Sequence, residues 1–433
     1  MPKNIFVIAL DDLNLGLLRT VRGADEYNFV GLLDYDEVVG AERFPMGELL
    51  AKAERQLDAF PSRVDAIVAY WDFPAICMLP LLRRRVGLPS PSLESVLKCE
   101  HKYWSRLEQR KVVPELVPRF CAFDPFDGEA LTKIDLEFPF WIKPVKSHSS
   151  HLGFKIHNVR EFRRSIRTIR ANIGRLAEPF NYVLGRATLP PEIAAVDGHH
   201  CIAEEIISAG QQCTLEGYVF AGEPEVYGIV DSVREGKHRS SFARYQYPSR
   251  LPRRVQERMS AAARCIMKHL DYADAPFNME FYWNARTDTI ALLEINARIS
   301  KSHCPLFWMV DGRSHQEVMI DVALGRRPAF PRRQGEHRLA AKFMLRRYED
   351  GVVTRVPDDD DIRRVRARFR DTLVRLMVAR DTRLAHLSFQ DSYSFEVAEI
   401  FMGADSQQQL LADYRRCLEM LDLRFAPLST AAA

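Results

Sequence analysis

The stretch FNMEFYWNARTDTIALLEINAR, from Phe277 to Arg298, decides the fold. Two runs of aromatic and β-branched residues, FNMEFYW and IALLEINA, flank a polar segment and predict an antiparallel hairpin. If the chain folds back near Thr287, Glu280 lies directly opposite Glu294, because both are seven residues from that centre. Side chains alternate between the two faces of a strand, so the even-numbered residues are predicted to share one face. These are Asn278, Glu280, Tyr282, Leu292, Glu294, Asn296 and Arg298.

Two glutamates that face each other across a hairpin imply a cation between them. Directly opposed side chains have Cβ atoms about 5 Å apart, and like charges at that distance repel. Magnesium prefers oxygen ligands, uses one or two carboxylates and completes its shell with water and phosphate oxygens. Glu280, Glu294 and Asn296 are therefore the predicted ligands of Mg²⁺, with Mn²⁺ as an alternative ion, while Arg298 offers a planar fork for phosphate or carboxylate. A hairpin whose acids are ordinary surface residues is the alternative, and the apolar odd-numbered positions disfavour it.

Composition limits the class of protein. A chain of 433 residues is long enough for two or three domains. Its 61 basic and 58 acidic residues nearly cancel, so no global basic field indicates a nucleic-acid partner. The first apolar run is six residues long and is followed at once by Asp11 and Asp12, so it is too short for a signal peptide or a membrane span. A cytoplasmic protein with no membrane partner is therefore expected. Eight dispersed cysteines without a C-x-x-C pair favour reduced thiols.

The N-terminal segment alternates apolar strands with helices. Runs at 4–10, 29–33 and 64–70 are predicted strands, and a helical stretch begins at Leu13. This alternation indicates parallel βαβ units and a Rossmann-like domain over residues 1–93. The segment has no G-x-G-x-x-G motif, so nothing in it indicates a dinucleotide.

Basic residues follow at helical and strand positions. Residues 93–110 are predicted to form one helix, with Lys98, Lys102 and Arg106 on one face. Lys143 lies in an apolar strand, FPFWIKPV, where an unpaired ammonium is costly and a polyanionic ligand is the favoured partner. The alternatives are a solvated basic helix face and a lysine that reaches solvent from a strand edge.

The order of these features resembles the ATP-grasp superfamily. The hairpin is similar to the superfamily's magnesium-binding hairpin, in which an acidic residue precedes an E-x-N-x-R strand. The resemblance implies that Lys102 and Lys143 bind the nucleotide phosphates, although His101 stands where relatives have aspartate.

The segment after Lys143 takes the place of the superfamily's phosphate-covering loop. The resemblance makes Ser149 and Ser150 phosphate ligands, since hydroxyls and backbone N–H groups of small residues approach phosphate oxygens closely. The loop has a single glycine, unlike the glycine-rich form, and the roles of His148 and His151 stay open.

Residues 201–207 resemble the strand and hinge between the two ATP-grasp lobes, whose backbone reads adenine. The resemblance therefore places Glu204, Glu205 and Ile207 at the nucleotide. It places Gln212 at the ribose hydroxyls, where an amide both donates and accepts.

The resemblance implies a combined α/β and α+β fold. A Rossmann-like pre-ATP-grasp domain is expected at 1–93, a two-lobed ATP-grasp domain at 94–335 and a small C-terminal α+β unit at 336–433. The layout is most similar to L-amino-acid ligases and biotin carboxylase-like proteins, but SKSHCP at 300–305 replaces the Q-V-E-H-P run that binds bicarbonate in biotin carboxylase.

The implied activity is that of an ADP-forming carboxylate–amine ligase that uses ATP and Mg²⁺. A small-molecule carboxylate would become an acyl phosphate, and an amine would displace phosphate to give an amide, with Lys143 and Arg298 as the catalytic residues. Two alternatives stay open: a carboxylase-like or kinase-like ATP-grasp enzyme with another acceptor, and a catalytically silent nucleotide sensor. The identity of the substrates, a homodimer and the role of His303 also stay open.

Overall fold

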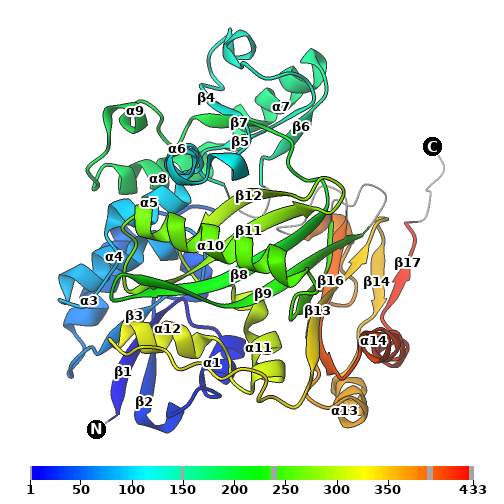
Figure 1. Cartoon of the computed structure of the whole chain (residues 1–433). Coiled ribbons are helices and arrows are strands. Elements are labelled where there is room, and N and C mark those ends of the chain that lie inside the picture. The colour runs from blue at the N-terminus through cyan, green and yellow to red at the C-terminus, as the bar shows by residue number, and fades with distance from the viewer. Residues whose placement is uncertain (1, 148–150, 236–240, 388–393, 429–433) are drawn as a thin grey trace. The chain divides into compact units, whose positions relative to one another are not determined.

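The computed structural model describes residues 2–147, 151–235, 241–387 and 394–428 (Figure 1). The chain forms two compact units, and each is described by itself. The predicted division into three domains at residues 93 and 335 stays a prediction. The first unit comprises Met1–Gly228, Leu251–Lys301 and Gln316–Ala329, and the second comprises Ile229–Arg250, Ser302–His315 and Phe330–Ala433.

The first unit begins with a parallel three-stranded sheet of order β2-β1-β3, which confirms the predicted βαβ arrangement. The central strand is apolar from Ile5 to Ile8, and these residues are at most 2% exposed because both faces of the sheet are covered. The first helix starts where the Asp11 carboxylate accepts a hydrogen bond from the N–H of Asn14. The elements are β1 (Lys3–Ile8), α1 (Asp12–Leu18), β2 (Tyr27–Leu32), α2 (Tyr35–Val38), α3 (Met46–Asp58), β3 (Ala66–Val68) and α4 (Ala75–Arg85).

Two helices follow, where one was predicted over residues 93–110. They are α5 (Leu93–Glu100) and α6 (Lys102–Val112). The helical conformation is interrupted at His101, which has φ −87° and ψ 99°. The imidazole Nδ1 of His101 accepts from the N–H of Trp104, so the ring caps α6 as an aspartate would. Burial lowers the pKa of His101 to about 4, which keeps the ring neutral and Nδ1 able to accept. The prediction of a continuous helix is wrong because this cap starts a new helix.

A four-stranded antiparallel sheet of order β4-β7-β5-β6 forms the next part of the first unit. The apolar face of α7 packs on this sheet through Phe162, Ile166 and Ile169, which contact a core that includes Phe140 and Ile142. The elements are β4 (Phe120–Phe123), β5 (Phe140–Pro144), β6 (Phe154–Ile156), α7 (Val159–Asn172), α8 (Gly174–Leu184), α9 (Pro191–Ala194) and β7 (Cys201–Glu205).

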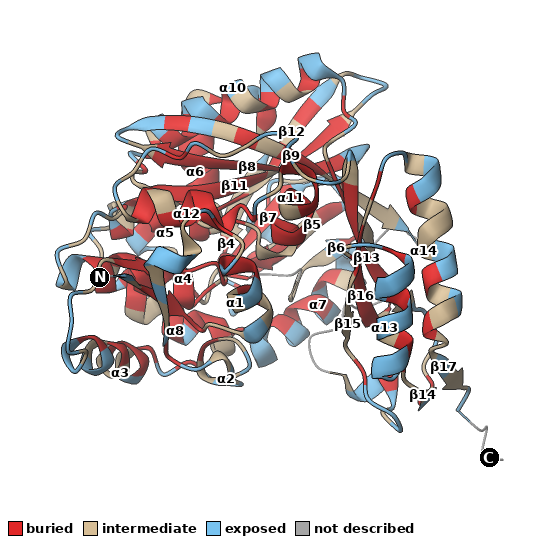
Figure 2. Cartoon of the chain, turned by 90° about the horizontal axis from the view of Figure 1, so that it is seen from below, coloured by how far each residue is buried: buried red, intermediate tan, exposed pale blue. Residues whose placement is uncertain are grey.

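The predicted hairpin is present as β11 and β12, and β8 pairs with the other edge of β11. A bulge after Glu280 changes the register, so that Phe281 pairs with Leu292 and Leu293 is the additional residue. The prediction that Leu292 shares a face with Glu294 is therefore wrong. Figure 2 shows that α10 buries one side and exposes the other, as its amphipathic sequence predicts. The elements are β8 (Gln211–Phe220), β9 (Glu223–Glu235), α10 (Arg253–His269), β11 (Ala275–Asn284), β12 (Thr289–Asn296) and α12 (Gln316–Ala323).

The second unit contains antiparallel strands in the order β9-β10-β13-β16-β15, of which β9 contributes its residues from 229 onward. Helices α13 and α14 bury Val365, Leu410 and Cys417 against Phe343 and Ile400 of the sheet. The elements are β10 (Ser241–Tyr247), α11 (Cys304–Asp311), β13 (Leu339–Arg347), β14 (Val352–Arg355), α13 (Asp359–Arg368), β15 (Leu373–Leu376), β16 (Phe395–Ala404), α14 (Gln407–Leu421) and β17 (Arg424–Ala426).

All eight cysteines are free thiols, and six of them are buried, as predicted for reduced side chains. Within the described ranges, no helix combines the length and the apolar character that crossing a bilayer requires.

Candidate active site

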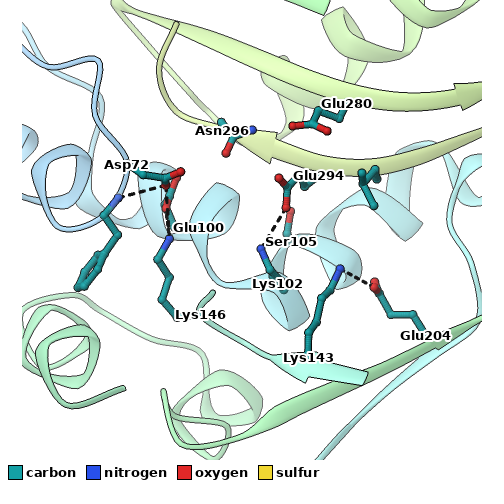
Figure 3. Close-up of polar contacts among 12 residues, drawn as sticks. Asp72, Glu100, Lys102, Ser105, Lys143, Lys146, Glu204, Glu280, Glu294 and Asn296 are labelled. Carbon is teal, nitrogen blue, oxygen red and sulfur yellow. Dashed lines mark hydrogen bonds and ion pairs between the residues drawn. The ribbon is translucent and has the colours of Figure 1, made fainter. Parts of the chain in front are cut away.

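Glu280 and Glu294 oppose each other on the hairpin of β11 and β12. They are direct partners in the strand register, which confirms the predicted pairing. Figure 3 shows both carboxylates with the side chain of Asn296 beside them. The Glu294 side chain keeps 30% of its surface exposed and is therefore accessible to a ligand. Three oxygen-bearing side chains are thus presented by one hairpin.

Lys102 reaches this hairpin from the first position of α6. Its Nζ lies 3.1 Å from Oε2 of Glu294, and its backbone N–H donates to the carbonyl of Val145. A cation at a helix N-terminus is disfavoured by the helix dipole, so an anion beside Lys102 stabilises it. Burial by itself would raise the pKa of Glu294, but the Lys102 and Lys143 charges outweigh burial and lower the pKa.

Lys143 projects from β5 into a buried ion-pair network. Its Nζ lies 2.7 Å from Oε2 of Glu204, and Nε of Arg106 lies 2.6 Å from the other carboxylate oxygen. None of the three side chains is more than 10% exposed. Burial opposes ionisation of Glu204, yet the charges of Arg106 and Lys143 hold its pKa at about 2, while burial lowers the pKa of Lys143. Lys143 is thus held in a buried, highly charged site, with Glu204 as its ion-pair partner.

Arg106 also joins α6 to the bulge of the hairpin. Its two terminal nitrogens donate to the carbonyl oxygens of Leu292 and Leu293, each at 2.8 Å. β12 lies at the edge of its sheet, and the guanidinium satisfies these two carbonyls. Arg106 therefore holds α6, β7 and β12 together around Glu294.

The predicted adenine-reading residues differ in their backbone environment. β7 lies between β4 and β5, so Glu204 is paired with both neighbouring strands, and its side chain is directed to Lys143. Glu205 ends the strand and is exposed, whereas Ile207 lies beyond it. Of the three, Ile207 has its backbone outside the strand pairing; their contact with a nucleotide stays a prediction.

Gln212 contacts one of the two hairpin glutamates. Its Nε2 donates to Oε2 of Glu280 at 2.8 Å, and its Oε1 accepts from the hydroxyl of Tyr282 at 2.9 Å. Because the tyrosine hydroxyl donates to the amide oxygen, the amide nitrogen is directed at Glu280. The structure thus places Gln212 beside the predicted metal ligands, and its contact with ribose stays a prediction.

A second group of charges lies next to Glu294. Lys146 donates to the carboxylate of Glu100, and both side chains are 2% exposed. Nη2 of Arg298 lies 2.8 Å from Oδ2 of Asp72, whose other oxygen is 4.0 Å from Nζ of Lys146. Burial lowers the pKa of Lys146, but the carboxylates of Glu100 and Asp72 outweigh it and raise the pKa.

Arg298 lies outside the strand from which it was predicted to project. β12 ends at Asn296, so the regular alternation of faces does not extend to Arg298. Its guanidinium is buried beside Asp72, and although burial opposes the charge, Asp72 raises the pKa of Arg298 above its usual value. The arginine is thus held rigidly by a residue of the N-terminal sheet region.

Three residues of this site, Asp72, Glu100 and Lys146, were not predicted from the sequence, and neither was the anchoring role of Arg106. Asp72 follows β3, and the carboxyl ends of parallel strands are where open α/β sheets bind ligands, so its position was a usable signal. Lys146 is three residues beyond Lys143, in the same basic segment. Nothing in the local sequence marks Glu100.

Two adjoining pockets of the first unit open between these side chains. Both are lined by acidic and basic side chains, as a site for a polyanion and its cations would be. Both include Cys99, Lys102 and Glu294. Asp72, Glu100, Lys146, Ser147, Ile295 and Asn296 complete the first, and Ser105, Arg106, Gln109, Lys143, Glu204 and Leu293 complete the second.

The predicted loop residues have different outcomes. His148, Ser149 and Ser150 lie outside the described residues, so their predicted phosphate contacts stay predictions. His151 is partly buried, and burial lowers its pKa. His303 belongs to the second unit, where its ring packs edge-on against Tyr245 with a centroid distance of 5.1 Å.

Comparison with known proteins gives a consistent result. The ATP-grasp domain family matches residues 136–305. An L-amino acid ligase from Bacillus licheniformis is similar over 99% of both chains, with a TM-score of 0.73 and 16% identity. Phosphoribosylglycinamide synthetase from Anaerococcus prevotii has a TM-score of 0.62 and 12% identity over 99% of this chain and 100% of that chain. Biotin carboxylase from Campylobacter jejuni has a TM-score of 0.64 and 15% identity over 98% and 92%.

No curated protein matches the chain by sequence. The matched segment contains the Lys143 strand and the Glu280–Glu294 hairpin, whereas Lys102 and Arg106 of the site lie before it. At these identities the structural neighbours establish the fold. Residues 136–305 therefore match the ATP-grasp domain family, and the chain as a whole shares its fold with the solved structures named above.

Proposed function

We propose that the protein is an ADP-forming carboxylate–amine ligase. The observation that carries this proposal is the opposed Glu280–Glu294 pair with Lys102 and Lys143 beside it, a combination of carboxylates and ammonium groups suited to a metal–nucleotide complex. The similarity of the fold to an L-amino acid ligase over nearly the whole chain supports the same reaction class.

The hairpin ligands fit magnesium. Two carboxylates and one amide oxygen are hard donors, and magnesium takes few protein ligands because it keeps waters and phosphate oxygens. Among the described residues no group of three His, Cys, Asp or Glu side chains forms a metal site, which disfavours a closed structural site of the zinc type. Glu280, Glu294 and Asn296 would hold the ion, which when bound neutralises the phosphate oxygens of the nucleotide.

Lys102 and Lys143 would hold the phosphates. In the structure each ammonium has a carboxylate partner, Glu294 at 3.1 Å and Glu204 at 2.7 Å. If Glu294 binds a cation, Lys102 loses part of its counter-charge and gains affinity for a phosphate oxygen. Glu204 lies between Lys143 and Arg106, so it keeps Lys143 directed while the ammonium donates its remaining hydrogens. Metal and nucleotide should therefore bind cooperatively.

The reaction proceeds in two balanced steps. A substrate carboxylate oxygen attacks the γ-phosphorus of ATP, which forms an acyl phosphate and breaks the bond to the β–γ bridging oxygen, releasing ADP. The nitrogen of the neutral amine then attacks the acyl carbon, a C–N bond replaces the C–O bond to phosphate, and the phosphate leaves with the proton that the nitrogen loses. Positioning and charge neutralisation dominate such a phosphoryl transfer, which suits a site built from lysine, arginine and carboxylate side chains.

A covalent thiol route is disfavoured. Cys99 lines both pockets, but it is buried, and burial raises the pKa of its thiol well above neutral pH. The thiol is therefore protonated at neutral pH, and the acyl group has no cysteine nucleophile there. Direct transfer from acyl phosphate to amine needs none.

A screen for products tests the proposal. The full chain would be incubated with Mg²⁺, ATP and single or paired amino acids, with a parallel series containing bicarbonate and other small carboxylates. We expect ADP and phosphate in equal amounts and an amide product by mass spectrometry. Pyrophosphate would indicate an adenylate and overturn the acyl-phosphate route, a bicarbonate-dependent product would favour a carboxylase, and nucleotide binding without turnover in any series would favour a sensor.

A further inference from the structure

Asn278 and Asn296 form an amide relay behind the hairpin ligands. They are direct partners in the register of β11 and β12, and they lie two residues along each strand from the Glu280–Glu294 pair. Nδ2 of Asn278 donates to the carbonyl oxygen of Arg298 at 2.9 Å. Nδ2 of Asn296 donates to Oδ1 of Asn278, also at 2.9 Å. Asn278 is 1% exposed and Asn296 is 8% exposed, so the relay is shielded from water.

The direction of this relay follows from the chemistry of its end. A backbone carbonyl such as that of Arg298 only accepts, so Asn278 must present its NH₂ group to it. The carbonyl of the Asn278 side chain then faces Asn296. Asn296 must therefore present its own NH₂ group, which donates to that carbonyl. The one remaining polar atom of Asn296, its amide oxygen, is left on the side of the pocket that Asn296 lines (Figure 3).

Without this constraint neither end of the Asn296 amide would be fixed, because its NH₂ group and its oxygen have nearly the same shape and either one would be free to face the pocket. An amide that presents its nitrogen cannot ligate Mg²⁺, so metal binding would first have to reverse it.

We propose that Asn278 is a positioning residue that holds the oxygen of Asn296 toward the metal. This inference rests on the proposed function, because it assigns the orientation of one ligand in the same metal–nucleotide site. Asn278 does not touch the metal or the nucleotide. It acts through Asn296 by fixing which end of a nearly symmetric side chain faces the pocket.

The test uses Asn278→Leu, which keeps the branched shape of the side chain, with methyl groups in place of the amide atoms, and removes both polar contacts. Calorimetry of the full chain with ADP is carried out in EDTA and again across a series of Mg²⁺ concentrations. We expect the affinity for ADP in EDTA to change less than twofold. The Mg²⁺ concentration that gives half-maximal enhancement of ADP binding should rise by about tenfold, which corresponds to about 1.4 kcal/mol. A loss of packing alone would weaken both measurements together.

A second pair of variants, made in a chain that carries Asn296→Asp, separates the effect of Asn278 on the orientation of residue 296 from its effect on packing. Asn296→Asp replaces the amide with a carboxylate, whose two oxygens are equivalent, so its orientation no longer matters. In the Asn296→Asp chain, adding Asn278→Leu should change the Mg²⁺ requirement by less than threefold. An equal tenfold loss in both backgrounds would show that Asn278 acts through packing and would overturn the inference.

The outcomes also distinguish this inference from the function on which it rests. Wild-type protein that binds ADP with no dependence on Mg²⁺ would contradict the metal site itself and therefore the proposed function. Wild-type protein with strong Mg²⁺ dependence that Asn278→Leu leaves unchanged would contradict only the role of Asn278. Thermal denaturation of each variant establishes that the folded protein is being compared.

Discussion

Replacement of Glu204 by glutamine should destabilise the first unit by about 3 kcal/mol at neutral pH. The Glu204 side chain is 6% exposed and lies between Lys143 and Arg106. These charges hold its pKa at about 2, against 4.5 for an ordinary glutamate, a difference of about 2.5 pH units. At about 1.4 kcal/mol for each unit, the charged form is favoured in the folded state by about 3 kcal/mol. Glutamine keeps the shape of the side chain but leaves two buried cations without a counter-charge, which is among the costly changes in a protein interior.

Urea unfolding followed by tryptophan fluorescence measures this loss. Trp104 on α6 and Trp141 on β5 report on the helix and the strand that the ion pairs join. Glu205→Gln is the matched control, because Glu205 is the adjacent residue with a side chain that is 48% exposed. We expect the control to change the free energy of unfolding by less than about 0.5 kcal/mol.

The pH dependence of the free energy of unfolding provides an independent check on the ion pairs of Glu204. A folded-state pKa below the unfolded value means that Glu204 contributes its full stability above about pH 4.5 and loses it as the pH falls toward 2. The difference between wild type and Glu204→Gln should therefore narrow over this interval. If the glutamine variant were as stable as the control at pH 7, or if the difference stayed constant down to pH 2, the assignment of a buried, ionised Glu204 would be refuted.

Three further predictions concern activity. Glu294→Gln should abolish ATP turnover, because it removes the anionic partner of Lys102, which is also a ligand of the proposed metal site; near-normal turnover at saturating Mg²⁺ would contradict the site. Lys143→Ala should raise the ATP requirement and slow the chemical step more than Lys102→Ala, since β5 and Glu204 hold Lys143 in place; steady-state and single-turnover kinetics would compare them, and equal effects would remove the distinction. Arg298→Lys should keep binding of an ATP analogue nearly intact by calorimetry but lower kcat and kcat/KM together, because lysine cannot reproduce a planar fork; lost nucleotide affinity with unchanged kcat would instead place Arg298 on ATP alone.

The hairpin was predictable because its evidence is local. Side chains alternate with a period of two, and the apolar odd-numbered residues determine which face is buried, so the opposition of Glu280 and Glu294 followed from counting. The bulge that moves Leu292 to the other face was not predictable in this way. It is stabilised by Arg106, which donates to the carbonyls of Leu292 and Leu293 from a helix far away in the chain.

The interruption between α5 and α6 shows a second limit of prediction from the sequence. Residues 93–110 have the apolar periodicity of one helix, and histidine is a less common cap than aspartate or serine. The imidazole of His101 becomes a good acceptor here because burial keeps it neutral and because its Nε2 lies 2.7 Å from the carbonyl of Val196. That contact joins residues 95 positions apart, so the cap depends on the folded environment.

The sequence by itself determined the alternation of strands and helices in the N-terminal segment and the opposition of Glu280 and Glu294, since these depend on periodicity and on residues close together in the chain. Only the tertiary structure decided the partners of the charged residues. Lys102 meets Glu294 across 192 positions, Arg106 meets Glu204 across 98, and Asp72 meets Arg298 across 226. Buried charges must be neutralised by whichever opposite charge the fold brings near, and that choice is made by the packing of distant segments rather than by any local pattern.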